Sequence, residues 1–239
     1  MYTLNSYLKL KILNYRNYLM KNIVIFGSGG HSKVILSEIL ESKNEFKFCG
    51  FVDSSKKTGS IVTKVKKKNY KIINLKSKKI KDLYGIIGIG DNFLRYKNYQ
   101  IIKSKFKNLK WAKIISKKSN INANVKIGAG SVILANSFIG SGSKINKHCI
   151  INSSTSIDHD NNFESFSSTG PGVITGGNVK LKKFSHLGIG CVVKNNILIC
   201  ENVICGGKSY VNKNCKKNSL YFGIPSKFIK TRKLGQKYL

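Results

Sequence analysis

IGAGSVILANSFIGSGSKI, from Ile127 to Ile145, places an isoleucine at every sixth residue. The same spacing continues to Val211, and thirteen of the fifteen positions on it are apolar. Because the chain is 41% apolar overall, chance would give about six, so the period is real. A second series lies two residues before each of these positions, and most of its members are small, as at Ser131 and Ser137.

A strict period of six fits neither the period of an α-helix nor that of an ordinary strand. It is typical of a parallel β-helix, in which six residues form one flat side and three sides close a coil. Gly and Asn recur between the two series, where turns require a positive φ. We therefore predict that the segment from Ile121 to Val211 winds about five stacked coils. A β-sandwich is the alternative, and fifteen steps without a phase slip argue against it.

The charge of the chain is strongly positive. Its 239 residues include 43 Lys and Arg against 10 Asp and Glu, a formal charge of +33. Such a charge attracts nucleic acid, acidic lipid or phosphorylated small molecules. The lysines are scattered and no nucleic-acid-binding motif accompanies them, so we favour a lysine-rich composition and expect no nucleic-acid partner.

The six cysteines contain no C-x-x-C pair, and several fall on the two series of the coil. We expect them to be reduced, buried packing residues rather than metal ligands. No stretch reaches the roughly 20 apolar residues of a membrane span. The basic first residues also lack the apolar core of a secretory signal, so we expect no transmembrane segment and a cytoplasmic protein.

A βαβ unit is predicted ahead of the coils. The buried-strand pattern Asn22–Phe26 is followed by the turn Gly27-Ser28-Gly29-Gly30-His31, an amphipathic run and a second strand that ends at Asp53. Such a turn aims backbone N–H groups and a helix N-terminus at an anion. Asp53 is placed to bind a ribose hydroxyl or a base edge. Ser32 stands where the dinucleotide motif has its third glycine, so the pattern indicates a nucleotide more than NAD.

The remainder of this domain follows the same alternation. A third strand is predicted over Tyr84–Gly90, a helix capped by Asp91 and Asn92 comes next, and a last strand over Lys110–Ile115 leads into the coils. The lysine-rich segment Lys56–Lys81 is predicted to be loop with one short strand. The ligand of this small parallel sheet is expected at the carboxyl ends of its strands, near Gly27–His31, Asp53 and Gly90–Asn92.

The chain thus divides into four parts. Residues 1–19 form an extension, for which an amphipathic helix is one interpretation. Residues 20–113 form a Rossmann-like nucleotide-binding domain, and residues 114–230 form the β-helix. Tyr221–Lys227 is predicted to be a turn that ends the coils, and residues 231–239 form a basic tail.

Three segments together resemble the bacterial sugar acetyltransferases, namely the sialic-acid O-acetyltransferases and the nucleotide-linked 4-amino-sugar N-acetyltransferases. They are IFGSGGH at 25–31 with FVD at 51–53, NSSTSIDHD at 152–160, and GIPSK at 223–227. The resemblance covers nearly everything from Met20 to about Lys230. It implies that the β-helix is left-handed and binds acetyl-CoA, that the first domain binds the nucleotide of a sugar substrate, and that a homotrimer forms active sites between its subunits.

The resemblance also implies roles for individual residues. His159 matches the catalytic base, Asp160 the carboxylate beside it, and Asn152 a residue near the reacting amine. The nucleotide site would comprise Gly27, Ser28, Gly29, His31, Asp53, Gly90, Asp91 and Asn92. The coenzyme A site would comprise Ser168, Gly188, Gly190, Gly206, Lys208, Gly223, Pro225 and Lys227. No metal is implied. Many relatives carry a second histidine where this chain has Ser168, so the acetyl side of the site departs from the family pattern.

The chemistry expected of His159 is proton removal. Acyl transfer from a thioester requires a neutral nucleophile and a base, and a histidine with a pKa near 6.5 can accept the proton at neutral pH. A neighbouring carboxylate would fix its tautomer. Asp158 and Asp160 flank His159, and strand neighbours point to opposite sides, so we expect Asp160 to serve. His159 lies in the outward phase, two residues after Ile157, and a plain surface histidine is the alternative interpretation.

Several functions remain open or can be set aside. Transfer to the 4-amino group of a nucleotide-linked sugar is the leading hypothesis, and O-acetylation of a sialic acid or related sugar is a close second. A non-catalytic nucleotide-binding scaffold is favoured by Ser168 alone. A zinc carbonic anhydrase would need two histidines five residues apart, and the four histidines, His31, His148, His159 and His186, contain no such pair. The roughly hundred residues ahead of the coils are too few for a sugar nucleotidyltransferase domain.

Overall fold

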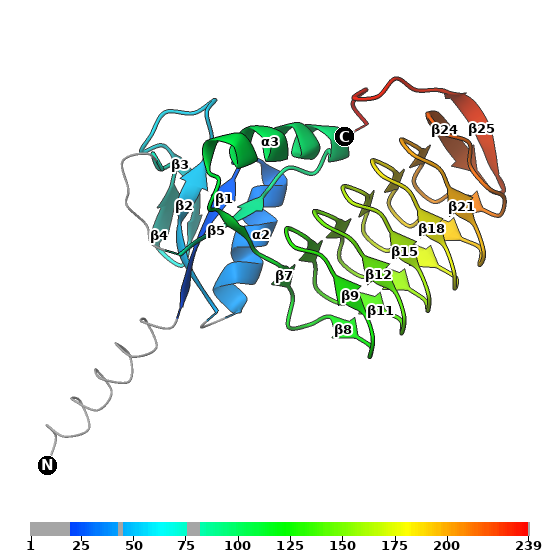
Figure 1. Cartoon of the computed structure of the whole chain (residues 1–239), viewed down its shortest axis with the longest axis horizontal. Coiled ribbons are helices and arrows are strands. Elements are labelled where there is room, and N and C mark those ends of the chain that lie inside the picture. Colours follow the sequence, from blue (N-terminus) through cyan, green and yellow to red (C-terminus); the bar gives the residue numbers. More distant parts are fainter. Residues whose placement is uncertain (1–19, 43–44, 76–81, 239) are drawn as a thin grey trace, which may run out of the picture.

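The computed structural model describes residues 20–42, 45–75 and 82–238 (Figure 1). The predicted extension 1–19 and part of the lysine-rich segment, 76–81, lie outside the described residues. The described chain consists of a small α/β domain followed by a long stack of short parallel strands, and the two parts pack side by side (Figure 1).

The first domain is built on a four-stranded parallel sheet of order β2-β1-β5-β6. Its strands are β1 (Lys21–Phe26), β2 (Phe46–Val52), β5 (Leu83–Ile87) and β6 (Lys110–Trp111). The helices are α2 (Gly30–Glu41) and α3 (Asn92–Lys105). Alternate residues of β1 pack on opposite sides, because Ile23 and Ile25 join Ile35 of α2 whereas Val24 joins Ile102 of α3. The helices therefore cover both faces of the sheet, as in other parallel sheets.

The lysine-rich segment differs from the prediction of one short strand. It forms an antiparallel hairpin of β3 (Ile61–Val65) and β4 (Lys68–Lys71). The turn residues Lys66 and Lys67 both have positive φ, 45° and 65°. Hairpin turns of this kind favour Asn and Gly, so a lysine pair gave no turn signal in the sequence.

The second part is a parallel β-helix with three ladders of two-residue strands. The first ladder holds β7 (Ile114–Ile115), β10 (Val132–Ile133), β13 (Ile150–Ile151), β16 (Ser168–Thr169), β19 (His186–Leu187) and β22 (Ile204–Cys205). The second holds β8 (Asn120–Ile121), β11 (Phe138–Ile139), β14 (Ser156–Ile157), β17 (Ile174–Thr175), β20 (Val192–Val193) and β23 (Tyr210–Val211). The third holds β9 (Lys126–Ile127), β12 (Lys144–Ile145), β15 (Asn162–Phe163), β18 (Lys180–Leu181) and β21 (Leu198–Ile199).

The period of six has two physical consequences in these coils. From Ile133 to Val211 every residue on the six-residue series is buried, and most form one continuous core. Every sixth residue from Asn124 to Lys208 also has a positive φ, so each side of the coil ends in one left-handed residue. Gly128 and Gly140 are required for another reason, because an added Cβ would lie within 2.6 Å of backbone atoms of the next coil.

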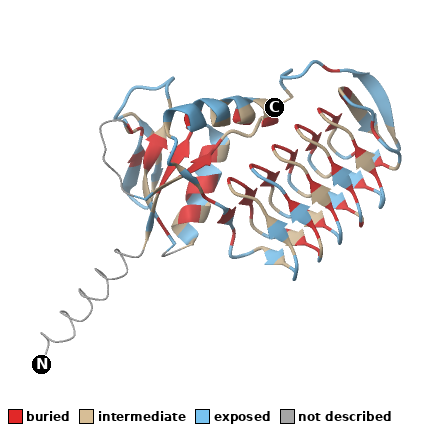
Figure 2. Ribbon diagram, viewed as in Figure 1, coloured by how far each residue is buried: buried red, intermediate tan, exposed pale blue. Residues whose placement is uncertain are grey.

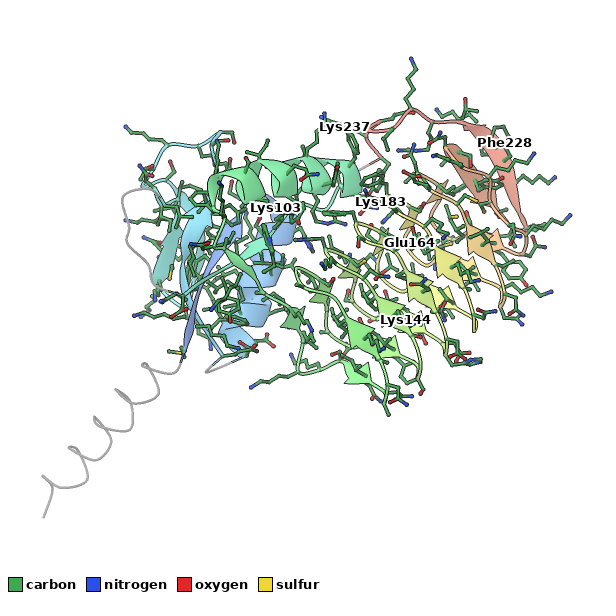
Figure 3. The ribbon with its side chains drawn as sticks, viewed as in Figure 1. Lys103, Lys144, Glu164, Lys183, Phe228 and Lys237 are labelled. Atoms are coloured by element: carbon green, nitrogen blue, oxygen red, sulfur yellow. The ribbon has the colours of Figure 1, made fainter. Side chains whose placement is uncertain are left out.

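The outward-facing residues differ in type and in burial from one ladder to the next (Figure 2). The covered face consists of Ile114, Val132, Ile150, Ser168, His186 and Ile204, all buried. The apolar face consists of Phe138, Ser156, Ile174, Val192 and Tyr210, which are partly or fully exposed. The lysine face consists of Lys126, Lys144, Asn162, Lys180 and Leu198, also partly or fully exposed, and Lys144 is labelled in Figure 3. The first ladder is therefore the covered side of the described coils.

An aromatic column joins α3 to the coils. His148, Phe166 and Phe184 lie eighteen residues apart with φ of 57°, 63° and 64°, and all three are buried. Phe166 contacts Tyr96 and Tyr99 of α3 with ring centroids 5.3 and 5.5 Å apart. Bulky residues rarely adopt positive φ, so packing against α3 stabilises this conformation. Lys183, labelled between α3 and the coils in Figure 3, lies 4.6 Å above the Tyr96 ring.

Two predictions about the ends of the coils were wrong. The expected strand Lys110–Ile115 is two strands in different sheets, because β6 pairs with β5 whereas β7 begins the coils. The expected terminal turn Tyr221–Lys227 lies within a hairpin of β24 (Ser219–Gly223) and β25 (Ser226–Thr231), and β24 extends the first ladder. Residues 232–238, here called the strap, return from β25 to α3 (Figure 1). The predicted basic tail thus packs on the domain interface.

Candidate functional site

A cavity of about 830 Å³ opens at the carboxyl ends of β1, β2 and β5. Its volume lies within the usual range for ligand sites in proteins. Gly27, Asp53 and Asp91 line it, with apolar walls from Ile73 on one side and Ile101 of α3 on the other. Lys56 and Lys105 also line it, so the cavity combines cations with apolar surface, as a nucleotide requires.

The Gly-rich turn is held open by its neighbours. Gly27 has a φ of 99°, and an added Cβ at Gly29 would meet no atom within 4 Å. The Ser28 hydroxyl donates to Oδ2 of Asp53 at 2.6 Å, and the Ser55 N–H and hydroxyl donate to Oδ1 at 3.0 and 2.7 Å. Partial burial acts to raise the pKa of Asp53, but these hydrogen bonds outweigh it and keep the pKa below its ordinary value. Asp53 is therefore ionised and fixes the turn.

His31 begins the first turn of α2 and also lines the cavity. Its Nε2 is buried and has no hydrogen-bond partner among the described residues. Burial, with a smaller contribution from the charge of Arg95, lowers the pKa of His31 to about 4. The imidazole is therefore neutral at pH 7 and can donate or accept one hydrogen bond with a ligand.

The start of α3 brings only part of the predicted residues to the cavity. Gly90 and Asp91 line it, and the Asp91 carboxylate caps the helix by accepting from Leu94 N at 2.8 Å. Asn92 is not among the described residues that line the cavity. It is 1% exposed, and its side chain donates to the carbonyls of Phe184 and Ser185 in the coils. Asn92 therefore joins the two domains, which the sequence did not reveal.

His159 lies at an exposed corner of the β-helix, just after β14. Its Nδ1 is 2.8 Å from Oδ2 of Asp160, and the two side chains are 61% and 66% exposed. The hydrogen bond with Asp160, and then the charge of Asp158, raise the pKa of His159. Asp158 does not contact the ring, since its Oδ1 accepts from the His159 N–H at 2.8 Å. The chain turns at this corner, and Asp160, with a φ of 57°, faces the imidazole.

Two residues that sequence reasoning missed hold this corner in place. The Ser143 hydroxyl donates to the Asp158 carbonyl at 2.9 Å and accepts from Asn161 N at 3.1 Å. The Asn161 amide donates to the carbonyls of Asp158, His159 and Gly176 at 2.8, 3.1 and 3.0 Å. Both residues belong to the small series of the six-residue period, and that membership is the signal that could have identified them.

The residues expected at the coenzyme A site separate into two groups. Gly188 and Gly206 stack on one another at the corner after the first ladder, and so do Gly190 and Lys208. An added Cβ at Gly206 would lie 2.1 Å from the Phe222 ring, so the hairpin that carries Gly223, Pro225 and Lys227 packs on this corner. Asn152 follows β13 and lies at this same corner, two coils before Gly188. His159 lies at the next corner of the same coil, after β14.

Ser168 lies elsewhere, on the covered face. It is 2% exposed, and its hydroxyl is 2.8 Å from Nδ1 of His186. The His186 ring in turn lies 4.9 Å from the ring of Tyr238 in the strap, whose hydroxyl accepts from Asn92 N at 3.0 Å. Burial lowers the pKa of His186 to about 3. Ser168 is therefore part of the domain interface, contrary to its expected place beside coenzyme A.

Comparison with known proteins places this geometry in context. Residues 22–102 match the PglD N-terminal domain family. This PglD-like domain contains the Gly-rich turn, Asp53 and most of α3, and thus nearly the whole lining of the cavity.

Solved structures match the chain beyond the PglD-like domain. The acetyltransferase domain of PglB from Neisseria gonorrhoeae FA1090, in complex with acetyl coenzyme A, is 21% identical with a TM-score of 0.78, covering 87% of this chain and 99% of that chain. PerB from Caulobacter crescentus, in complex with CoA and GDP-perosamine, is 24% identical with a TM-score of 0.76, covering 87% and 97%. WeeI from Acinetobacter baumannii AYE is 21% identical with a TM-score of 0.77, covering 88% and 100%. The predicted fold, a Rossmann-like domain followed by a left-handed parallel β-helix, is confirmed.

The described part of the chain contains neither a membrane-spanning helix nor a cluster of metal ligands. Neither α2 nor α3 has the length and apolar content needed to cross a membrane. Among residues 20–42, 45–75 and 82–238, no three His, Cys, Asp or Glu side chains converge as metal ligands would.

Proposed function

We propose that the protein is an acyltransferase that moves an acetyl group from acetyl-CoA to the 4-amino group of a nucleotide-linked deoxy sugar, in the cytoplasm, for surface-glycan biosynthesis. The observation that carries this proposal is the exposed His159–Asp160 pair, with 2.8 Å between Nδ1 and Oδ2, on a chain that also has a nucleotide-sized cavity. The shared fold with PglB, solved with acetyl coenzyme A, and with PerB, solved with CoA and GDP-perosamine, supports it.

The cavity supports the nucleotide part of the proposal. The N-terminus of α2 and the open turn around Gly29 suit a diphosphate, which Lys56 would also attract. The apolar walls at Ile73 and Ile101 suit a base and ribose. Asp53, held by Ser28, keeps the turn open and has remaining lone pairs for a ribose hydroxyl.

His159 would act as the general base. With Asp160 bonded to Nδ1, the free Nε2 takes the amine proton while the nitrogen attacks the thioester carbonyl. The C–N bond forms, the C–S bond breaks, and the proton passes from the imidazolium to the departing thiolate. A backbone N–H of a neighbouring coil would stabilise the oxyanion. No covalent intermediate is needed.

A homotrimer would complete the site. His159 is not among the described residues that line the cavity, so one chain does not bring the base to the nucleotide. The apolar face, with Ile174 51% exposed and Val192 37% exposed, suits contact with another copy. Ile189, 64% exposed between Gly188 and Gly190, would then lie against coenzyme A in the groove between subunits, with Lys208 attracting its phosphates.

The test mixes purified protein and acetyl-CoA with UDP-, dTDP- and GDP-linked 4-amino sugars and with sialic acid, and follows release of free thiol. We expect one 4-amino sugar nucleotide to turn over. H159A should lower kcat at least about a hundredfold, the scale of a lost general base. N195A is the matched control, because Asn195 is exposed at the same corner two coils further on, and it should leave kcat unchanged.

Other outcomes point to other functions. Turnover of sialic acid alone would favour O-acetylation, and no turnover of any sugar would favour a non-catalytic nucleotide-binding scaffold. An H159A variant as active as wild type would remove His159 from the mechanism. Light scattering of the same preparation should give the mass of three chains, and a monomer that turns over would refute the shared site.

A further inference from the structure

We propose that Arg95 is a positioning residue, which fastens the loop Gly88–Asp91 of the cavity to the β-helix and turns its carbonyl groups away from a bound anion. That anion is the diphosphate of the proposed function, and to this extent the inference rests on that function. The fastening itself follows from contacts that involve no ligand.

Arg95 lies in the first turn of α3 and is 1% exposed, which makes it the largest fully buried side chain among the described residues. A guanidinium has five N–H donors in a fixed planar arrangement. Here five oxygens surround it. They belong to Ile89, Gly90, Asn92, His148 and Ser167, at 3.0, 2.7, 2.5, 3.0 and 3.4 Å from its nitrogens. Every donor of the buried group is therefore used.

These acceptors come from three separate parts of the chain. The carbonyls of Ile89 and Gly90 belong to the loop that lines the cavity, and those of His148 and Ser167 belong to turns of the coils. Arg95 thus bonds the edge of the cavity directly to the β-helix. The opposite edge, at 54–58, has no comparable bond to the coils among the described residues.

Among the described residues Arg95 makes no ion pair, because all five acceptors are neutral and no carboxylate lies within 4.0 Å of the guanidinium; Asp91 acts on it only at longer range. Burying an unpaired cation is costly, and a nearby anionic ligand would reduce that cost. The field of Arg95 reaches the cavity, since it contributes, after burial, to the low pKa of His31 in the lining. The positive charge of Arg95 therefore acts on the cavity lining together with Lys56 and Lys105, and against Asp53 and Asp91.

The orientation of the loop carbonyls follows from the same bonds. A carbonyl oxygen at the edge of an anion site repels the anion, whereas one bonded to Arg95 faces the coils. Lysine cannot replace arginine here, because its three donors on a single nitrogen cannot reach five oxygens spread around a plane. At least two of the buried carbonyls would lose their donor.

The experiment compares R95K with F166L in the full chain. Phe166 packs in the same interface against Tyr96 and Tyr99, but among the described residues it has no hydrogen bond to the Gly88–Asp91 loop. Amide hydrogen exchange is measured without ligand, and calorimetry measures binding of UDP, GDP and dTDP. The hydrogen-bonded amides at the two ends of the loop are those of Gly88, which donates to the Phe26 carbonyl, and Asn92, which donates to the Tyr238 hydroxyl. We expect their exchange to be at least about tenfold faster in R95K than in F166L, with equal exchange at 54–58. The Kd of the preferred nucleotide should rise at least about tenfold in R95K only.

The two readouts separate this inference from the proposed function. Equal exchange of the loop in both variants would overturn the role of Arg95, whatever the nucleotide does. Selective exchange in R95K without nucleotide binding by wild type would support the fastening and remove the nucleotide from the proposed function. If R95K does not fold, a crystal structure of the wild type decides: the carbonyls of Ile89 and Gly90 must face the Arg95 guanidinium, and carbonyls that point into the cavity would overturn the inference.

Discussion

His159 owes its orientation to the backbone of Asp160. A φ of 57° turns the Asp160 carboxylate toward the imidazole, and Asp tolerates this conformation better than most residues. Gly142 lies one coil below, where an added Cβ would be 2.4 Å from Oδ1 of Asp160. Gly177 lies one coil above, where an added Cβ would be 2.6 Å from the imidazole. Two glycines in neighbouring coils therefore make room for the pair.

Asp160→Asn tests the pair through the pH dependence of the reaction. The hydrogen bond with Asp160, and then the charge of Asp158, raise the pKa of His159. A base with a lower pKa stays deprotonated to lower pH, so the acidic limb of the kcat/KM profile should move to lower pH in D160N. The maximal kcat/KM should fall about tenfold or more, because the imidazolium loses its partner.

Asp158→Asn is the control, since Asp158 bonds the backbone of His159 and acts on the ring through its charge alone. Its profile should shift less than that of D160N. Identical profiles for D160N and wild type would contradict the role of the carboxylate.

The exposed corner of His159 could be predicted from its phase after Ile157, because the six-residue period fixes which residues face outward. The positions of Ser168 and Asn92 could not. Ser168 also faces outward in the period, but the α/β domain lies over its ladder. The period defines outside and inside for one coil, and it contains no information on which outer face another domain covers.

At the scale of elements, the β-helix assigns a different surface to each ladder. The covered face is buried, with Ile114 and Val132 against α2 and His186 against the strap. The apolar face is partly or fully exposed, and the lysine face carries Lys126, Lys144 and Lys180. The strands of the β-helix and their spacing could be predicted because every coil repeats the same local sequence pattern. The two hairpins could not, because β3–β4 turns through two lysines and β24–β25 breaks the period.

Phe166→Ala tests the aromatic column as an element of stability. The Phe166 side chain is 5% exposed and contacts two tyrosines of α3 and the stacked ring of His148 at 4.9 Å. Removing a buried aromatic ring leaves a cavity, so the free energy of unfolding should fall by about 3–5 kcal/mol. Urea unfolding followed by circular dichroism measures it. Leu198→Ala on the lysine face should cost less than about 1 kcal/mol, and an equal loss in both variants would contradict the column.

At the scale of the whole molecule, the two domains are joined by neutral histidines around a buried cation. Burial, and then the charge of Arg95, lower the pKa of both His148 and His186 to about 3. In the unfolded chain their pKa is the ordinary 6.5. Between these values the unfolded chain binds more protons, so stability is full above pH 6.5 and falls as the pH decreases toward 3.

Each of these histidines should reduce the free energy of unfolding by about 1.4 kcal/mol per pH unit below pH 6. We expect urea midpoints to decrease from pH 7.5 to pH 4.5 in wild type. His148→Phe keeps a ring against Phe166 and should remove about half of the slope that the two histidines contribute. H159Q is the control, because that exposed histidine does not join the interface. An unchanged slope in H148F would show that His148 is not held neutral.

The strap also constrains how long the coil can be. It leaves β25 at the far end of the stack and returns to α3, where Tyr238 contacts Asn92 and Arg232 lies 5.6 Å from the Tyr238 ring. One extra turn of eighteen residues above Ser185 would raise the hairpin by about 4.8 Å, the distance between neighbouring strands. The strap would then have to span a distance about 4.8 Å longer to keep Tyr238 in contact with Asn92. We therefore expect the strap to limit the number of coils that the β-helix can contain.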